Sequence, residues 1–271
     1  MAEPAPRSHI RFGATTVTYL PDGVVRTDPL AAFPGTTRAG WDAYPDLLDA
    51  DGWLAVSVGS FLIRNDDGVA LVDLGLGDVH FEVPAAATYD GGQLLTNLRA
   101  ECVSPAEVDL VLFTHLHRDH VGWTGDGAGG LTFPNARHVV DRKEWNHWQV
   151  RDDPVGPDPE TILTPLTPVV EFFAAEPPAP GIHPLPTPGH TPGHTSFLIT
   201  DPATDETLLI LGDVIHTRAQ LANLDWIFRS DFDARLAAEH RTGLLHGRGE
   251  SEPIIANGHF SGSVFAAGTQ P

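Results

Sequence analysis

Residues 115–120 contain four side chains of the kinds that bind metal ions in proteins: His115, His117, Asp119 and His120. They directly follow an apolar run at residues 108–113, which predicts a strand. Imidazole and carboxylate ligands together suit zinc and similar divalent cations, and such a site needs no cysteine. His115 and His117 can point to one side of an extended segment because they are two residues apart. Asp119 and His120 are adjacent and must diverge, so they are well placed to reach a second ion.

Three later segments repeat this arrangement, with polar residues on the loop just after an apolar strand. Residues 187–194 read Thr-Pro-Gly-His-Thr-Pro-Gly-His and contain His190. Asp213 follows the apolar run 208–211, and His259 follows the run 254–256. Strand ends on one edge of a sheet are where a rigid scaffold gathers ligands from distant positions. His190, Asp213 and His259 are therefore candidates to complete the metal site.

The order of the expected elements predicts two packed sheets with helices outside, folded as a single domain over residues 1–271. Strands are expected at residues 10–19, 56–64, 69–73, 108–113, 137–140, 183–186, 195–200, 207–211 and 253–256. Asn-Asp-Asp-Gly at residues 65–68 indicates a hairpin. Helices are expected within 91–102, after the capping patterns at 104–107 and 141–144, and at 231–245. The proline-rich residues 152–180 are expected to form a connector.

The first 55 residues show little regular pattern outside the strand expected at 10–19. Residues 1–8 are expected to be a loose tail, and residues 21–55 a long irregular excursion that lines a pocket or builds a homodimer contact. Trp41, Trp53 and Trp226 lie in irregular stretches and are candidates for a pocket wall. Trp145 and Trp148 are three residues apart, which is typical of a helix that faces the core.

Charge and composition argue against several classes of function. The chain carries 36 acidic and 16 basic residues, for a formal net charge of −20, which repels phosphate backbones and anionic membranes. We therefore expect neither a nucleic-acid nor a membrane partner. The single cysteine, Cys102, precludes an internal disulfide and is expected to be a buried residue at a helix end. The N-terminus lacks a signal-peptide pattern and no apolar run approaches the ~20 residues of a membrane span, so we expect a cytoplasmic protein.

Together, these motifs resemble the metallo-β-lactamase-fold hydrolases. The resemblance runs from about residue 56 to 262 and rests on five segments in the family's order: Val-Asp-Leu-Gly at 72–75, His-x-His-x-Asp-His at 115–120, Pro-Gly-His-Thr-Pro-Gly-His at 188–194, Gly-Asp at 212–213, and His259. It implies an α/β fold, a four-layer αββα sandwich. It also implies two divalent metal ions, one held by His115, His117 and His190 and the other by Asp119, His120 and His259, with Asp213 bridging them. A di-iron, oxygen-reducing branch has Glu at position 117, so His117 favours the hydrolytic branch and Zn²⁺.

The resemblance also implies a chemistry. Two cations about 3.5–4 Å apart can share a hydroxide, because a metal lowers the pKa of bound water toward about 7. That hydroxide would attack a carbonyl or phosphoryl centre, with Asp119 helping to hold the two cations together. His216 occupies the position at which lactonase members often carry a tyrosine that contacts the substrate's carbonyl oxygen, so it is a candidate donor or proton carrier. Asp73 and His194 are expected to orient the ligand histidines through hydrogen bonds.

The sequence context of these motifs most resembles lactonases and the related organophosphate hydrolases. A dinuclear hydrolase acting on a small ester-like substrate, most readily a lactone such as an N-acyl homoserine lactone, is the leading hypothesis. Phosphotriesterase, arylesterase or β-lactamase activity is the enzymatic alternative. A metal-binding scaffold that kept the fold is the alternative from another class. A glutathione thioesterase and a nuclease are disfavoured, since no basic C-terminal patch or inserted nucleic-acid-binding domain is present.

Overall fold

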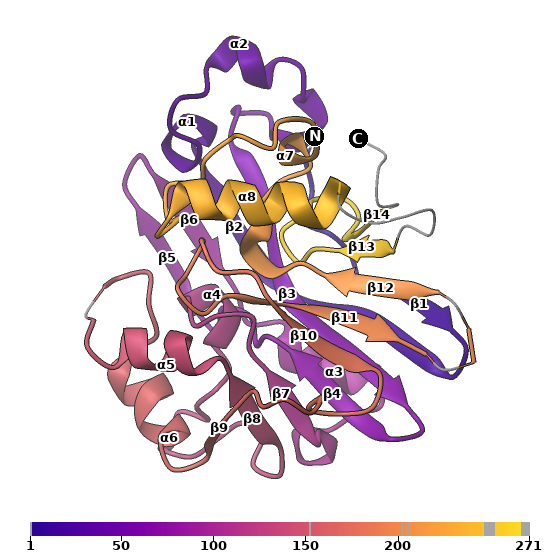
Figure 1. The fold of residues 1–271 in the computed structure, drawn as a ribbon. Helices are drawn as coiled ribbons and strands as arrows, with labels where there is room; N and C mark the ends of the chain where they lie inside the picture. Colours follow the sequence, from indigo (N-terminus) through magenta and orange to yellow (C-terminus); the bar gives the residue numbers. More distant parts are fainter. Residues whose placement is uncertain (1, 152, 202, 205, 247–252, 267–271) are drawn as a thin grey trace.

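Two β-sheets pack face to face in the computed structural model, with helices on their outer surfaces (Figure 1). The structure describes residues 2–151, 153–201, 203–204, 206–246 and 253–266. The strands of the first sheet are β1 Ser8–Phe12, β2 Thr15–Thr27, β3 Leu54–Asn65, β4 Gly68–Val72, β5 His80–Val83, β6 Ala87–Asp90, β7 Leu110–Leu112, β8 Arg137–Val140 and β9 Val170–Phe172. Those of the second are β10 Ile182–Pro186, β11 Thr195–Thr200, β12 Thr207–Ile210, β13 Ile254–Ala256 and β14 Phe265–Ala266.

The helices are short except for one near the C-terminus. They are α1 Pro29–Ala32, α2 Arg38–Trp41, α3 Leu94–Ala100, α4 Arg118–Val121, α5 Arg142–Trp148, α6 Thr164–Leu166, α7 Ala219–Ala222 and α8 Ala234–His246. Tighter turns of 3-10 type cover Pro45–Leu47, Pro105–Glu107 and Gly212–Val214, and a π turn covers Pro159–Leu163. In the described part of the chain, no helix is long and apolar enough to cross a membrane.

The strand order places the carboxyl ends of β4, β7, β12 and β13 on one edge of the sandwich. The first sheet runs β5-β6-β2-β3-β4-β7-β8-β9, with β1 on β2, and the second runs β10-β11-β12-β13-β14. In the first sheet β4, β7 and β8 are parallel, and in the second β12 and β13 are parallel. Parallel neighbours deliver their carboxyl ends to the same side of a sheet. The residues that follow β4, β7, β12 and β13 are therefore brought together.

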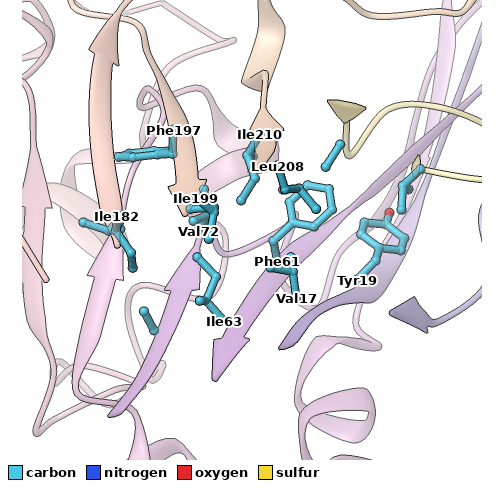
Figure 2. Close-up of a cluster of buried hydrophobic side chains, with 14 of the residues drawn as sticks. Val17, Tyr19, Phe61, Ile63, Val72, Ile182, Phe197, Ile199, Leu208 and Ile210 are labelled. Atoms are coloured by element: carbon cyan, nitrogen blue, oxygen red, sulfur yellow. The ribbon is translucent and has the colours of Figure 1, made fainter. Parts of the chain in front are cut away.

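The inner core lies between the two sheets (Figure 2). Alternate residues of each strand point into it, which is the two-residue period of extended chain. The first sheet contributes Val17, Tyr19, Phe61, Ile63 and Val72, and the second contributes Phe197, Ile199, Leu208 and Ile210. Each such side chain gains about 1.5–3 kcal/mol by leaving water, so this layer holds the sheets rigidly against each other.

The intervening residues face outward and are covered by helices. Leu62 and Leu71 of the first sheet pack in a second core with Leu98 of α3 and with Trp145 and Trp148 of α5. On the other side, α8 lies over the second sheet (Figure 1). Its Leu244 and Leu245 pack in a smaller cluster with Leu209 and Ile255. These layers confirm the four-layer αββα sandwich, and both tryptophans of α5 are buried as predicted.

The local signals in the sequence are largely confirmed. The hairpin at residues 65–68 joins β3 to β4. Ser104 and Glu107 form both hydrogen bonds of the capping box, and the Asp141 side chain accepts the Lys143 N–H at the start of α5. The connector at 152–180 contains α6 and β9 as well as a π turn.

The N-terminal predictions need correction. Residues 2–8 are not a loose tail: Ala2 and Ala5 are only 4% and 2% exposed, and the Ala5 N–H bonds to Ser57 Oγ at 2.8 Å. Small alanines fit against the β3 end, so this segment packs. The strand expected at 10–19 is two strands, because Gly13 turns the chain with φ +55°. Residues 21–27 then continue β2 instead of starting the excursion, which occupies only the segment before β3.

Cys102 also departs from expectation. It is exposed and adopts a left-handed φ of +59° directly after α3, a conformation that ends the helix. The turn directs its side chain outward, so Cys102 is not the buried residue that the sequence predicted. The homodimer contact proposed for the excursion stays a prediction.

Candidate metal centre

The seven predicted metal-binding residues converge where the carboxyl ends of the parallel strands meet. They form two groups whose ligand atoms lie within 4.8 Å of one another: His115, His117, His190 and Asp213 in one, and Asp119, His120 and His259 in the other. The structure thus brings together all seven residues, which come from segments up to 144 positions apart in the sequence.

The first group is tight and buried. His117 Nδ1 lies 3.0 Å from His115 Nε2 and 2.9 Å from His190 Nε2. Asp213 Oδ2 completes the group, 3.7 Å from His115 Nε2 and 3.3 Å from His190 Nε2. Zinc–nitrogen bonds of about 2.0–2.1 Å in a tetrahedron put neighbouring ligand atoms about 3.3 Å apart. The spacing of these four atoms therefore fits a single tetrahedral cation.

The second group is more open. His120 Nε2 and His259 Nε2 lie 3.2 and 2.9 Å from Asp213 Oδ1, and each lies 3.7 Å from Asp119 Oδ2. Asp119 is the only one of these side chains that reaches appreciable exposure, at 21%. Asp213 turns one carboxylate oxygen to each group, which is the geometry of a bridging ligand.

Two buried atoms without hydrogen-bond partners support the fit of a cation. His120 Nε2 is buried and has no hydrogen-bond partner in the described part of the chain, and neither does Asp213 Oδ1. The two atoms face each other at 3.2 Å without the angles of a hydrogen bond. Buried polar atoms left unpaired are costly, and a shared cation satisfies both.

Hydrogen bonds at the far ring nitrogens point the lone pairs of His115 and His120 into the site. Thr114 Oγ1 donates its only hydrogen to Asp73 Oδ2 at 2.8 Å. Toward His115 Nδ1, 3.0 Å away, the hydroxyl can therefore act only as an acceptor. Asp73 Oδ2 also lies 2.8 Å from His120 Nδ1. Both rings therefore carry their proton on Nδ1 and present Nε2 to the metal side. Asp73 holds a left-handed φ of +61°, which is strained for a residue other than glycine.

The same device fixes His190 and His259. His190 Nδ1 lies 2.9 Å from Asp231 Oδ1, and His259 Nδ1 donates to the Ser57 carbonyl oxygen at 2.8 Å. Burial raises the pKa of Asp231. The role of Asp231 could not be predicted from the sequence, because no motif marks this residue and it lies 41 positions from His190.

The charges of the site are strongly coupled. Burial, together with the neighbouring imidazoles, depresses the pKa of His115, His117 and His190 well below the ordinary value, so these rings are neutral and able to bind a cation. Burial alone would raise the pKa of Asp213, but the surrounding histidines hold it well below its ordinary value. Burial likewise opposes protonation of His120, yet the charge of Asp213 and its neighbours raises the pKa of that ring.

His194 has a different role from the one predicted. Its Nε2 accepts the backbone N–H of Asp213 at 2.9 Å, and its Nδ1 lies 2.8 Å from Thr187 Oγ1. It therefore positions the bridging aspartate and contacts no ligand histidine through these bonds. Burial lowers the pKa of His194 to about 3, which keeps the ring neutral and Nε2 free to accept. A Cβ on Gly212 would lie 2.6 Å from this Nε2, so only glycine permits the contact.

Glu144 ties the two histidine loops together. This fully buried carboxylate of α5 accepts the Leu116 N–H at 3.0 Å and the Trp148 Nε1–H at 2.7 Å through Oε1. Its Oε2 accepts the Gly193 N–H at 3.1 Å, on the loop that carries His190. Burial raises the pKa of Glu144, although these hydrogen bonds oppose the rise. In the sequence Glu144 stood out only as part of a capping pattern, so its role was missed.

His216 lies at the edge of the first group. Its Nε2 is 3.2 Å from Asp213 Oδ2, and its ring stacks on Phe228 with centroids 3.6 Å apart. Both ring nitrogens are buried without a hydrogen-bond partner among the described residues. The backbone N–H of His216 donates to Gln220 Oε1, which fixes the residue while leaving its ring available.

A cavity of about 330 Å³ opens onto the metal-binding residues. Its wall includes Val25, Thr27 and Ala32, so the N-terminal segment does line the pocket. The expected tryptophans do not. Trp41 is fully buried and packs against Trp226, with ring centroids 4.9 Å apart, in an aromatic cluster behind the wall. Phe228 of the same cluster does line the cavity. Trp53 is likewise not among its lining residues.

Comparison with known proteins places this geometry in a family. The sequence pattern of the metallo-beta-lactamase superfamily matches residues 54–247. An N-acyl homoserine lactonase of Bacillus cereus is 30% identical over 218 residues, which cover 76% of this chain and 82% of that protein. An N-acyl homoserine lactonase from a Bacillus species is 29% identical over 226 residues, covering 79% and 83% of the two chains.

Solved structures show the same fold. AidC, described as a dizinc quorum-quenching lactonase in complex with a product, superposes with a TM-score of 0.82 at 21% identity, over 96% of this chain and 92% of that one. The hydrolase AbOPH gives a TM-score of 0.80 at 24% identity, over 98% and 94%. With half of its length and more matched by the family's pattern, the chain belongs to the metallo-beta-lactamase superfamily.

Proposed function

We propose that this protein is a dinuclear zinc hydrolase that opens the ring of a lactone, with N-acyl homoserine lactones as the substrate class. The observation that carries the proposal is the Asp213 carboxylate, which turns one oxygen to each of two groups of ligand atoms. The relatives from Bacillus are named N-acyl homoserine lactonases, and the chain matches them over most of their length. This similarity supports the choice of substrate.

In this proposal the seven residues divide between two cations. One is held by His115, His117 and His190, the other by Asp119, His120 and His259, and Asp213 bridges them. When bound, two such cations generate a nucleophile from water at neutral pH and polarise the carbonyl under attack. The donor set, nitrogen and carboxylate oxygen without cysteine thiolate, suits zinc.

The chain's own residues orient and tune the site. Asp73 and Asp231 hold the far nitrogens of two ligand rings, which fixes the rings and raises their basicity. Asp213 and Asp119 supply the negative charge that lets two dications lie close together. Most of the candidate ligand side chains are buried, which strengthens the electrostatic interactions among them.

His216 is the candidate for direct contact with the substrate. Its two ring nitrogens are unpartnered within the described chain, and its ring lines the cavity beside Asp213. It can therefore donate a hydrogen bond to the carbonyl oxygen of a bound lactone or carry a proton to the leaving alkoxide. The stacked Phe228 ring holds the imidazole in that orientation.

A substrate panel on zinc-loaded protein tests the proposal. The panel contains N-acyl homoserine lactones, a phosphotriester, an aryl ester, a β-lactam and a thioester. We expect the highest kcat/KM with a lactone. A higher value for another class would replace the substrate assignment. Less than one bound ion together with no turnover of any substrate would instead support a metal-binding scaffold and remove the enzyme assignment.

A further inference from the structure

The wall of the catalytic cavity carries an unexpected charge. Apart from the metal-binding aspartates, its charged lining residues in the described chain are Arg118 and Arg229. The protein has 36 acidic and only 16 basic residues, so a wall lined by arginine alone runs against the composition. The two residues lie 111 positions apart, one at the start of α4 and the other on the loop before α8.

Within the described residues, neither guanidinium has a paired carboxylate. Among the described residues, no carboxylate forms an ion pair with Arg118 or Arg229, and no side-chain hydrogen bond engages either of them. Arg118 Nε is buried without a partner, and its guanidinium lies over the Phe81 ring, 5.6 Å from the centroid. An arginine that is partly desolvated and unpaired is a favourable binding site for an anion.

A tyrosine shares this wall with the two arginines. Tyr89 lines the same cavity and stacks on Phe81 with centroids 4.4 Å apart. Burial raises the pKa of Tyr89, Asp119 raises it further, and the charges of Arg118 and Arg229 both act to lower it. Arg118, Arg229 and Tyr89 therefore line one cavity, to which their side chains can offer hydrogen-bond donors.

Arg118 also stands where two cavities meet. A second cavity of about 550 Å³ shares Phe81 and Arg118 with the catalytic one. Asp158 lines this second cavity, and its Oδ1 accepts the N–H groups of Glu160 and Thr161 at 2.9 and 2.8 Å. The charge of Arg118 helps to lower the pKa of this exposed carboxyl, but the two side chains form no ion pair, so the guanidinium of Arg118 stays available to a ligand.

We propose that Arg118 and Arg229 bind a carboxylate at the far end of the substrate's acyl chain, so that the preferred substrate is an anionic acyl lactone. This inference rests on the proposed lactonase function and adds the substrate's charge to it. The lactone ring lies at the metal-binding residues, and the chain runs along Phe81 and Val83 to the arginines. An uncharged acyl chain would cover the partly buried guanidinium of Arg118 and give it no partner in place of water.

The test uses a matched pair of N-acyl homoserine lactones, one ending in a carboxylate and the other in a carboxamide. We expect kcat/KM to be about 10- to 100-fold higher for the carboxylate, mainly through KM, which is the range of one or two charged hydrogen bonds. Raising the salt concentration should shrink the preference, because Arg229 is exposed and screened. Equal kcat/KM for the two lactones would overturn the inference.

Variants locate the effect. Arg229→Met, and Arg118→Met beside the ligand His117, should each reduce the ratio of the two kcat/KM values, while Arg118→Lys keeps the charge and part of the ratio. Arg235→Met removes an exposed charge of α8 that lines neither cavity, and should leave the ratio unchanged. A ratio that falls equally in Arg235→Met would assign the preference to net charge and contradict the site.

Binding of inert lactams with the same two chain ends separates this inference from the lactonase assignment. We expect the carboxylate lactam to bind more tightly in calorimetry, with the difference lost in Arg229→Met. If neither lactone is hydrolysed, the proposed function fails and the lactam affinities still decide the anion site. If both lactones are hydrolysed equally and the lactams bind equally, the function stands and the anion site is wrong.

Discussion

The metal-binding centre and the wall of its cavity are built in opposite ways. In the centre the Nδ1 atoms of four ligand rings each have a partner, and the side chains are nearly all buried. In the wall, Phe81 and Val83 are 36% and 43% exposed and come from β5, a strand whose four residues are all exposed. The centre is thus preorganised for one chemistry, whereas the wall is free to change with the substrate.

This difference indicates that the centre determines the reaction and the wall determines the substrate preference. A rigid, satisfied centre keeps reacting groups in place, and a small error there costs much of the rate. A wall of scattered, half-exposed side chains contributes smaller and independent increments of binding. Changes in the centre should therefore alter the metal content and kcat, and changes in the wall should alter mainly KM.

Removing the bridge should have the largest effect. Asp213→Ala deletes the carboxylate shared by both groups, so we expect bound zinc to fall below two ions per chain and kcat/KM to drop at least about 1000-fold. His117→Ala should do the same through the first group. Elemental analysis and lactone kinetics measure these losses, and circular dichroism checks that the fold is kept. Near-normal activity in either variant would contradict the two-metal assignment.

His216→Phe should cost less and leave the metals in place. The variant keeps the ring that packs on Phe228 but removes the nitrogen that faces the substrate, so we expect kcat to fall about 100-fold, as for loss of a general acid or hydrogen-bond donor. The zinc content should stay at two ions. An unchanged kcat and pH profile would remove His216 from the mechanism.

Glu144→Gln tests whether the loops need their clamp. The amide can still accept from Leu116 through one oxygen, but it presents N–H to Gly193 N–H, so that bond is lost. We expect zinc affinity to fall about 10-fold and the free energy of unfolding to fall by about 1–3 kcal/mol. Zinc titration with a competing chelator and urea denaturation measure these changes. Glu176→Gln, the same change at an exposed residue of the connector at 152–180, serves as the control.

His138→Phe should alter the pH dependence of stability without affecting the centre. This ring of β8 is buried without hydrogen bonds among the described residues, and burial lowers its pKa to about 4. Between this value and the ordinary pKa of 6.5, His138 binds a proton in the unfolded chain but not in the native one. The free energy of unfolding therefore decreases as the pH falls below 6.5. In metal-free protein, the variant should lose about 1.4 kcal/mol less than the parent between pH 7.5 and 5.5. If urea denaturation gave the same loss of stability between the two pH values in the variant and the parent, this prediction would be wrong.

Phe81→Ala should have the smallest effect. Phe81 is partly exposed and contacts the pocket from the side, so we expect KM for a lactone with an apolar chain to rise about 3- to 5-fold, the equivalent of roughly 1 kcal/mol of lost apolar contact. The value of kcat and the zinc content should not change. A loss of bound zinc in this variant would break the separation between centre and wall.

The convergence of the seven candidate ligands could be predicted from the sequence because these residues lie next to recognisable strands. His115, Asp213 and His259 each follow an apolar run, and parallel pairing brings such positions to one edge. The sandwich followed from the same pattern of strands and helices. Short motifs therefore carried most of the information about the fold and the ligands.

The remaining parts depend on contacts between distant segments that leave no local trace. Glu144 and Asp231 meet their partners through tertiary packing, and His194 turns toward the Asp213 backbone because Gly212 makes room for it. Trp41 lies in an irregular stretch yet is fully buried, since aromatic neighbours enclose it. Irregular sequence thus says little about whether a side chain reaches a pocket.

The central claim is that two cations act together at Asp213. Titrating metal-free protein with zinc while following hydrolysis of an N-acyl homoserine lactone tests it most directly. We predict that activity rises until two equivalents have bound and then stays constant, and that Asp213→Ala never reaches this level. Full activity with one bound equivalent, or none with two, would contradict the account.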